Sequence, residues 1–348
     1  MRDYNIDEPL VRIIKELYDS ATSAVLQNNQ LGDFFRTTVG VRQGCLLSPA
    51  LFNVFLENIM QEALTNFETS ISIGGRPLSN LRFADDIDLM AGDGGEHQDL
   101  STRVERSSGA YGMEVSNPKS KGMVNSAVQG TRTAVTMCGE LLEDVDHFKY
   151  LGSILNRDGT STQEIKVRIA QATAALARLH PILKSKNISL QVKVKLYRSL
   201  VVSIFLYGCE SWTTTAETER RIQAFEMKCL RKLLGISYLQ RRTNVSVRQE
   251  VETTCGTHET LLATVKRRKL NWFGHVCRHD SLAKTILQGT VAGGRKRGRP
   301  RKTWMDNIKE WTGLTTPQLI RKAENRSTWA RITAASCHGA PTTLGHGS

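Results

Sequence analysis

The 348-residue sequence has no apolar run long enough to cross a membrane and no paired cysteine motif. Its longest apolar stretch, residues 200–206, is interrupted by Ser203, whereas a spanning helix needs about 20 apolar residues. The seven cysteines are odd in number and include no Cys-x-x-Cys pair, which disfavours a disulfide framework. The first residues also lack the apolar core of a secretory signal. We therefore expect a soluble protein of a reducing, intracellular compartment.

Acidic residues are also in short supply, with 34 Asp and Glu against 47 Lys and Arg and a net charge of +13. The surplus is concentrated in residues 265–302, which hold twelve Lys and Arg and one acid, Asp280. A local positive field of this kind favours a polyanion as partner. Because 40% of the residues are hydrophobic, the chain can bury a core, and wholesale disorder is excluded.

The first 155 residues combine helical and strand patterns. Acids and Pro9 precede an apolar stripe at helical spacing, and Ser48-Pro49 opens a second amphipathic helix. A third helix is predicted around residues 98–111. Together with several short strands, these helices predict an α+β fold class. The predicted strands lie around residues 71–73, 81–83, 87–90, 113–124, 134–138 and 148–151, and a hairpin is predicted from residues 24–26, the Asn28-Asn29 turn and residues 34–39.

After Gly159 the pattern becomes purely helical, with apolar residues recurring three and four positions apart. A helical bundle is therefore predicted up to about residue 240. A basic helix around residues 261–272 follows, and a Gly/Arg/Pro-rich linker over residues 292–302 leads to a short amphipathic segment and a polar tail.

Two adjacent aspartates, Asp85 and Asp86, stand at the predicted bend between two strands. Crowded carboxylates repel each other unless a cation lies between them. Phosphoryl-transfer enzymes use such hard oxygen ligands to hold Mg²⁺. The alternative is a solvated turn, since aspartate is common in turns.

Four short blocks follow one another in this first part of the chain. They are Val41-Arg42-Gln43-Gly44-Cys45-Leu46-Leu47-Ser48-Pro49-Ala50-Leu51-Phe52-Asn53, Phe83-Ala84-Asp85-Asp86, Tyr111-Gly112-Met113-Glu114-Val115 through Lys119, and Phe148-Lys149-Tyr150-Leu151-Gly152. Together, and in this order, they resemble the signature blocks of the reverse transcriptase of LINE-type, non-LTR retrotransposons, whereas no single block would be specific. The resemblance extends to about residue 312 through Leu206-Tyr207-Gly208 and through residues 268–275.

The resemblance implies a right-hand polymerase that copies an RNA template from a DNA primer and dNTPs by two-metal phosphoryl transfer with Mg²⁺ (or Mn²⁺). For each residue outside the aspartate pair the alternative is structural: a loop glycine, a solvated lysine or plain strand packing. The implied parts are a partial palm at residues 1–155, a helical thumb-like region at 156–240, a basic nucleic-acid-binding region at 241–312 and a polar tail at 313–348. The implied site residues are Asp85 and, more weakly, Asp86 for the metal, Arg42, Gln43 and Gly44 for nucleotide and template, Lys119 as proton donor to pyrophosphate, and Tyr150, Leu151 and Gly152 for the primer end.

One departure from the family concerns the first catalytic aspartate, which precedes the helix that begins near Pro9 here. The sequence begins at Met1, and its early acids are Asp3, Asp7 and Glu8. The resemblance therefore predicts that the chain as it stands lacks one bridging metal ligand and is inactive. The alternative from a different class is a non-catalytic nucleic-acid-binding remnant.

The basic linker contains Arg297-Gly298-Arg299-Pro300-Arg301, which resembles an AT-hook core. In that motif an extended backbone fits the narrow minor groove of A·T tracts while arginines follow its negative potential. This reading predicts duplex DNA as a partner and a nuclear location. The alternative is a flexible basic linker or nuclear-import run that binds phosphates without sequence preference.

A third constellation holds residue types that bind Zn²⁺. Its second half is spaced too tightly for the usual ligand pattern, so the alternative is that His275 caps or packs and the others are incidental. The set is Cys255, His258, His275, Cys277 and His279.

Overall fold

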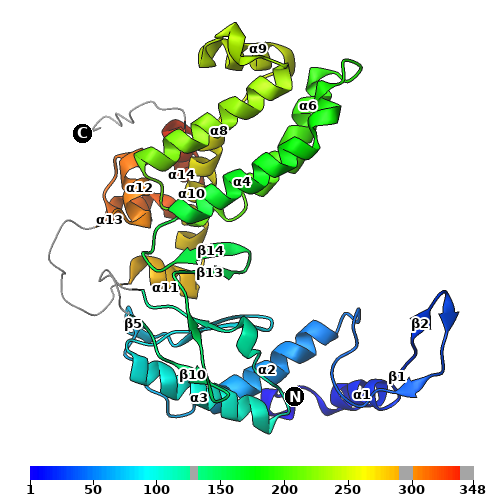
Figure 1. The fold of residues 1–348 in the computed structure, drawn as a ribbon. Helices are drawn as coiled ribbons and strands as arrows, with labels where there is room; N and C mark the ends of the chain where they lie inside the picture. The colour runs from blue at the N-terminus through cyan, green and yellow to red at the C-terminus, as the bar shows by residue number, and fades with distance from the viewer. Residues whose placement is uncertain (126–131, 290–300, 338–348) are drawn as a thin grey trace. The chain divides into compact units, whose positions relative to one another are not determined.

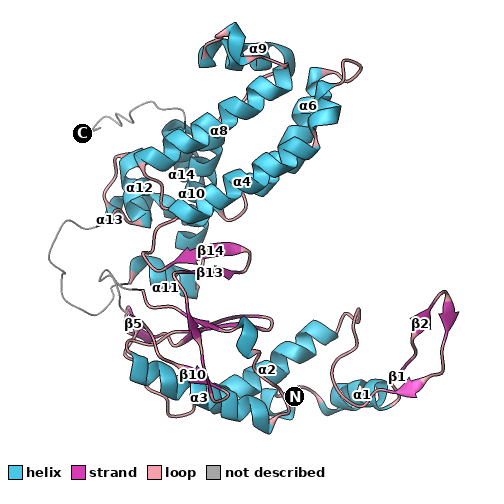
Figure 2. Ribbon diagram, viewed as in Figure 1, coloured by secondary structure: helices cyan, strands magenta, loops and turns pink. Residues whose placement is uncertain are grey.

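The computed structural model describes residues 1–125, 132–289 and 301–337 and combines many helices with small two-stranded sheets (Figure 1, Figure 2). This mixture agrees with the predicted α+β fold class. The chain divides into two compact units, the first made of Met1–Ile71, Pro77–Ser120 and Ala134–Leu142, and the second of Ser72–Arg76, Lys121–Thr133 and Glu143–Ser348. Within the described residues, no helix has both the length and the apolar character needed to cross a membrane.

The first unit contains three α-helices and several two-stranded ladders in its described part. The strand β6 (Arg76–Pro77) spans the division between the units along the chain. The other elements are η1 (Arg2–Tyr4), α1 (Glu8–Asp19), β1 (Thr22–Ser23), β2 (Leu26–Gln27), β3 (Gln30–Leu31), β4 (Phe35–Arg36), α2 (Ser48–Leu64), β7 (Asn80–Phe83), β8 (Asp86–Leu89), α3 (Gly94–Ala110), η2 (Asn117–Lys119), β10 (Thr136–Met137) and β11 (Glu140–Leu141).

The core of this unit lies between α2 and α3. Met60 of α2 and Leu100 of α3 are both fully buried in it. The helix α3 begins four residues earlier than predicted because the Asp93 carboxylate accepts a hydrogen bond from Glu96 N at 2.9 Å and caps its first turn. The strand predicted over residues 113–124 is wrong for its first part: Pro118 lacks an N–H to pair and lies in the 3₁₀ turn η2.

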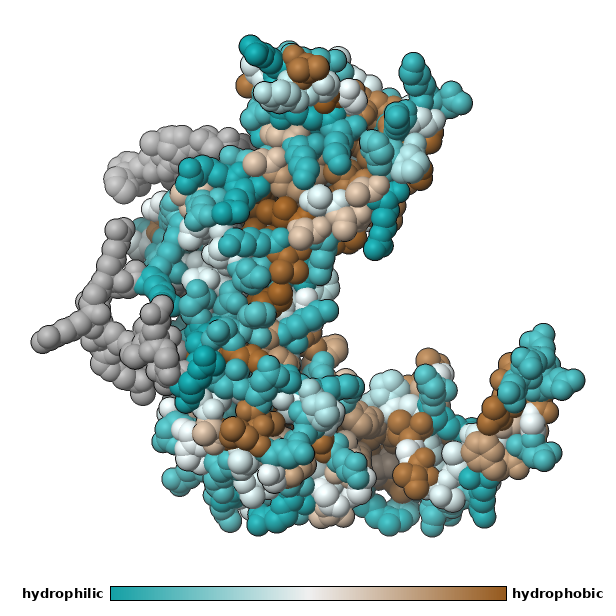
Figure 3. Space-filling model, in the orientation of Figure 1, coloured by the Kyte–Doolittle hydropathy of each residue, from teal (hydrophilic) through white to brown (hydrophobic). Residues whose placement is uncertain are grey.

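The helix α1 departs from the usual behaviour of an amphipathic helix. Its apolar stripe is present in the sequence, yet Leu10, Ile13 and Leu17 are 50%, 62% and 40% exposed. Apolar side chains also lie at the surface of the β2–β3 hairpin, which follows α1 along the chain (Figure 3). The predicted helix is confirmed, but within the structure its stripe does not enter a core.

The second unit is mainly helical. It carries the antiparallel hairpin β13–β14, in which Tyr150 pairs with Ser153, and the parallel pair β9–β12. Its elements are β5 (Ser72–Ile73), β9 (Lys121–Gly122), β12 (Glu143–Asp144), β13 (His147–Tyr150), β14 (Ser153–Asn156), α4 (Thr162–Arg178), α5 (His180–Lys184), α6 (Leu190–Leu196), the π-helical η3 (Tyr197–Val202), α7 (Ser203–Phe205), η4 (Cys209–Ser211), α8 (Ala216–Leu234), η5 (Tyr238–Gln240), α9 (Asn244–Cys255), α10 (Leu261–Arg278), α11 (Leu282–Gln288), α12 (Trp304–Thr312), α13 (Thr316–Glu324) and α14 (Arg326–Cys337).

The end of the described chain differs from the predicted polar tail. Residues 316–337 form α13 and α14, which pack on α10 and α12 around Leu319 and Trp329. The Trp329 indole N–H donates to Leu270 O at 2.8 Å. Its ring takes the space that a Cβ at Gly274 would need. The buried residues in this segment are few and widely spaced, so its composition does not indicate that it packs into a core.

A fully buried lysine joins the helices of this second core. Lys269 of α10 donates from Nζ to Trp212 O at 2.8 Å and to Asn307 Oδ1 at 3.0 Å. The same Nζ lies 4.6 Å from the centroid of the Trp304 ring. Burial lowers the pKa of Lys269 to about 7, with a smaller contribution in the same direction from Lys302.

We predict that Lys269→Met abolishes a rise in stability with pH. Because the folded-state pKa of Lys269 lies below its ordinary value of 10.5, folding expels a proton between these two pH values. The free energy of unfolding should therefore rise with pH across that window, with a slope approaching about 1.4 kcal/mol per pH unit. Urea unfolding at pH 7.5 and 9.5, followed by tryptophan fluorescence, measures it.

All five tryptophans lie in the second unit, so their fluorescence reports that unit alone. The control variant is Lys232→Met on the exposed side of α8, which should keep the rise. An equal rise in Lys269→Met and in the unmodified chain would contradict the assignment to Lys269.

Candidate functional site

The aspartate pair lies at the tip of the β7–β8 hairpin in the first unit. Phe83 pairs with Asp86, so Ala84 and Asp85 form a two-residue loop. Both aspartates are exposed. Ala84 has φ +51°, a left-handed conformation that costs an L-residue roughly 1–2 kcal/mol. The predicted bend is confirmed, and it presents two carboxylates to solvent on a strained turn.

The strands of this hairpin are anchored to α2 and α3. Ile87 and Leu89 pack against the core of these helices, and Arg82 forms an ion pair with Glu57 of α2 at 2.8 Å. Asp88, two residues beyond the pair, is partly buried, and its burial raises the pKa of its carboxyl group. Among the described residues, no group of three or more His, Cys, Asp or Glu side chains is placed to hold a metal, so the pair gains no third such ligand there.

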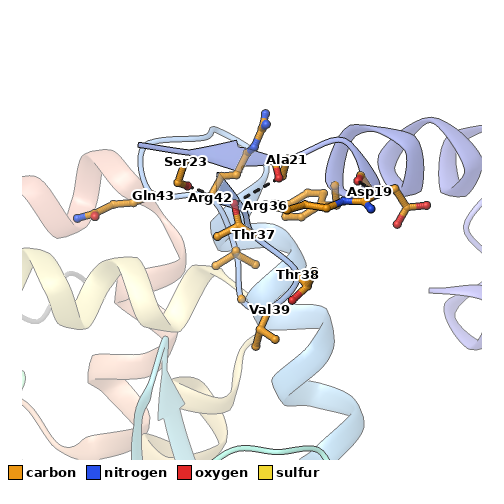
Figure 4. Close-up of a pocket in the computed structure, with 12 residues that line it drawn as sticks. Asp19, Ala21, Ser23, Arg36, Thr37, Thr38, Val39, Arg42 and Gln43 are labelled. Atoms are coloured by element: carbon orange, nitrogen blue, oxygen red, sulfur yellow. Dashed lines mark hydrogen bonds between the residues drawn. The ribbon is translucent and has the colours of Figure 1, made fainter. Parts of the chain in front are cut away.

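A cavity of about 270 Å³ lies elsewhere in the first unit, between the end of α1, the β1–β4 pair and residues 37–43 (Figure 4). Arg42 and Gln43 of the predicted nucleotide block line it, while Gly44, with φ +82°, follows directly. Arg36 and Asp19 line the same cavity. Two of the three predicted residues are thus brought to one cavity.

Backbone and hydroxyl contacts hold the walls of this cavity together. Arg36 Nη2 donates to Asp19 O at 2.9 Å, and Thr37 N donates to Ala21 O at 3.0 Å. On the far side of the block, Ser48 Oγ donates to Arg42 O at 2.5 Å and ties the loop to the start of α2. Sequence reasoning missed Arg36 and Asp19, because neither lies in a recognisable block; their only signal is their place around the β2–β3 hairpin.

Lys119 and the predicted primer residues lie at two further places. Lys119 is exposed at the end of η2 in the first unit. Tyr150, Leu151 and Gly152 belong to the β13–β14 hairpin of the second unit, where Leu151 and Gly152 form the loop with φ +46° and +82°.

The basic motif falls largely outside the described residues, because Arg297, Gly298, Arg299 and Pro300 lie in the gap 290–300. Arg301 is the first residue after this gap, and its guanidinium donates to Asp158 O at 2.6 Å.

The zinc constellation is not assembled. His258 Nε2 lies 3.2 Å from Glu226 Oε1, a buried carboxylate that also accepts from Leu261 N at 2.9 Å. His275 and His279 stack with ring centroids 4.3 Å apart. Across the described ranges no metal-binding group of three is formed, so the hypothesis that these residues form a zinc cluster is wrong for this structure. His258, three residues before α10, instead contacts Glu226 of α8, and Glu226 also accepts from the first backbone N–H of α10.

Comparison with known proteins identifies the class of the first part of the chain. Residues 1–155 match the family model described as reverse transcriptase (RNA-dependent DNA polymerase). This match confirms, for residues 1–155, the resemblance found in the sequence blocks.

Particular relatives come from mobile elements. The chain is 29% identical over 252 residues to a putative uncharacterized transposon-derived protein of Caenorhabditis elegans, covering 68% of this chain and 86% of that protein. It is 22% identical to the probable RNA-directed DNA polymerase from transposon X-element of Drosophila melanogaster and 23% identical to that from mobile element jockey of Drosophila funebris. Each of these two matches covers 68% of this chain and 26% of the polymerase.

We predict that Ala84→Gly stabilises the chain by roughly 0.5–1 kcal/mol. Glycine relieves the left-handed strain at this position, and the greater freedom of the unfolded chain offsets part of the gain. The melting temperature, followed by circular dichroism, measures the change. Ala174→Gly, on the exposed side of α4, should instead destabilise by about 1 kcal/mol. Equal losses in both variants would show that Ala84 carries no strain.

Proposed function

We propose that the reverse transcriptase domain is built for RNA-templated DNA synthesis, with Asp85 and Asp86 as its metal-holding carboxylates. The observation that carries the proposal is their placement on an exposed turn whose strands are fixed to α2 and α3. Mg²⁺ in nucleotide-processing sites is commonly held by one or two protein carboxylates together with substrate phosphates and water, so this pair fits Mg²⁺ or Mn²⁺. Such an ion would neutralise charge on the transferred phosphoryl group.

The cavity beside the Arg42 block supports a nucleotide- or template-binding role for that block. Arg36 and Arg42 supply two positive charges against the single carboxylate of Asp19. Guanidinium groups form paired hydrogen bonds with phosphate oxygens. Gln43 adds an amide that both donates and accepts hydrogen bonds. Gly44 leaves room for a nucleotide close to the backbone.

The remaining assignments follow the family resemblance. Lys119 would donate a proton to the pyrophosphate leaving group, and the turn at Leu151 and Gly152, with Tyr150, would hold the primer end. Residues 1–155 would be the palm and 156–240 the thumb. The template is then RNA, and the primer is DNA extended with dNTPs.

A second candidate function is nucleic-acid binding without catalysis, favoured by the net charge of +13 and its concentration in residues 265–302. In this role the basic region would contact duplex phosphates, with the residues from Arg297 to Arg301 in an A·T minor groove. The same run would act as a nuclear-import signal.

The metal assignment predicts that Asp85→Ala weakens Mn²⁺ binding at least about tenfold in the presence of template–primer and dNTP, because one of two carboxylates is lost. Mn²⁺ titration followed by electron paramagnetic resonance measures it. Asp33→Ala removes an exposed aspartate outside the hairpin and should leave the affinity unchanged. Equal Mn²⁺ affinity in the chain and in Asp85→Ala would refute the metal assignment.

Primer extension on an RNA template separates the two candidate functions. Incorporation that Asp85→Ala abolishes establishes catalysis and shows that the prediction of an inactive chain is wrong. Absence of incorporation, with binding to the same duplex that falls steeply with salt and is unchanged or slightly stronger in Asp85→Ala, establishes the binding function.

A further inference from the structure

The turn between β13 and β14 holds one residue, Leu151, in a conformation that its side chain does not favour. Leu151 and Gly152 both have positive φ, and for leucine this left-handed conformation is costly. Tight two-residue hairpin turns usually place Asn, Asp or Gly at such positions. Contacts from outside the hairpin must therefore stabilise the turn.

Two side chains from separate segments of the helical part donate hydrogen bonds to the two carbonyls of this turn. Tyr207, which follows α7, donates its hydroxyl to Leu151 O at 2.8 Å. Arg168 of α4 donates from Nη2 to Gly152 O. The Arg168 guanidinium carbon lies 4.5 Å from the centroid of the Tyr207 ring, so the two side chains also stack on each other.

Arg168 is itself held by a buried carboxylate. Glu164 Oε1 accepts from Arg168 Nε at 2.6 Å, and its other oxygen accepts from Ile154 N of β14 at 2.8 Å. Glu164 and Arg168 are 3% and 7% exposed. Burying an ion pair costs desolvation free energy, which these hydrogen bonds offset only in one arrangement. The pair thus fixes the direction of the guanidinium toward the turn.

Two glycines allow the close approach of these segments. A Cβ at Gly152 would lie 3.2 Å from Tyr207 Oη. Gly208, with φ +65°, would place a Cβ 2.9 Å from Ser153 Oγ. The segment around Tyr207 therefore fits the turn closely from both sides.

We propose that Arg168 and Tyr207 are positioning residues that hold the Leu151–Gly152 turn in the conformation that receives the 3′ end of the primer. This inference rests on the proposed primer-holding role of the turn. Leu151 and Tyr207 remain 38% and 51% exposed, so the outer side of the turn stays accessible to a ligand. Arg168 and Glu164 act through the turn and are buried beneath it.

Tyr207→Phe tests the proposal, because it removes the hydroxyl that bonds Leu151 O and keeps the ring that stacks on Arg168. The probes are two RNA/DNA duplexes of equal length: one has a recessed primer 3′ end, and the other is a closed dumbbell with no end. Fluorescence anisotropy gives both dissociation constants, and their ratio is the preference for a primer end.

We expect Tyr207→Phe to lower this preference about fivefold, the effect of one lost hydrogen bond, with dumbbell affinity unchanged. Arg168→Lys should lower it similarly, since lysine keeps the charge but lacks the planar group. Tyr238→Phe, at a ring 92% exposed on η5, should leave the preference unchanged.

Two results would overturn this inference and leave the proposed primer-holding role intact. One is an unaltered preference in Tyr207→Phe. The other is an equal loss of affinity for both duplexes with a lower melting temperature, which indicates a merely structural role. A chain that binds both duplexes without any preference for the primer end overturns the proposed primer-holding role and the inference with it.

Discussion

The helical part of the chain depends on one constraint: the buried backbone groups of residues 206–214, which connect α7 to α8, need hydrogen-bond partners outside a regular helix. Turns within the segment pair some of these groups, and side chains of α10 and α12 bind others. Arg268 donates to Leu206 O at 3.1 Å, and Lys269 donates to Trp212 O at 2.8 Å. Asn307 both donates to and accepts from the backbone of Thr214 at 2.8 Å. An unpaired buried carbonyl or N–H would cost about 1–3 kcal/mol, so these contacts define how α10 and α12 pack.

The same connecting segment carries Tyr207, and through it the constraint reaches the β13–β14 turn. The hydrogen bonds that satisfy residues 206–214 therefore also set the position of the ring that holds Leu151 O. Structural polar contacts and the proposed primer-holding role are in this way linked within a single unit. The carboxylates proposed to hold the metal depend on a different anchor, the packing of β8 on α2 and α3 in the first unit.

Much of the candidate site could be predicted from the sequence because its residues are close together along the chain. The apex at Asp85 and the start of α2 at Ser48 both follow from local patterns. The strand predicted over residues 148–151 ends instead at Tyr150, and Leu151 begins a turn that the sequence pattern did not indicate. Contacts between distant residues could not be predicted. Glu164 and Arg168 have the spacing of an ordinary surface ion pair, and only the fold shows that they are buried.

Distance along the chain also explains why the packed helices α13 and α14 were not predicted at the end of the sequence. Trp329 lies 59 positions beyond Leu270, and its indole N–H donates to the Leu270 carbonyl. The Trp329 ring fits there because Gly274 has no side chain. Neither feature can be inferred from composition, so the sequence predicts a polar tail for this segment. Lys269 is a similar case, since a lysine in a basic helix predicts exposure and its partner Asn307 lies 38 positions away.

If the β13–β14 turn holds the end of the primer, as we propose, a photoreactive group at the primer 3′ terminus will crosslink to it. A DNA primer carrying 4-thiothymidine at its 3′ terminus is annealed to an RNA template, bound to the chain and irradiated. Mass spectrometry then locates the attached peptide. We expect attachment within residues 147–156. Attachment confined to other parts of the chain, under conditions where the duplex is bound, would contradict it.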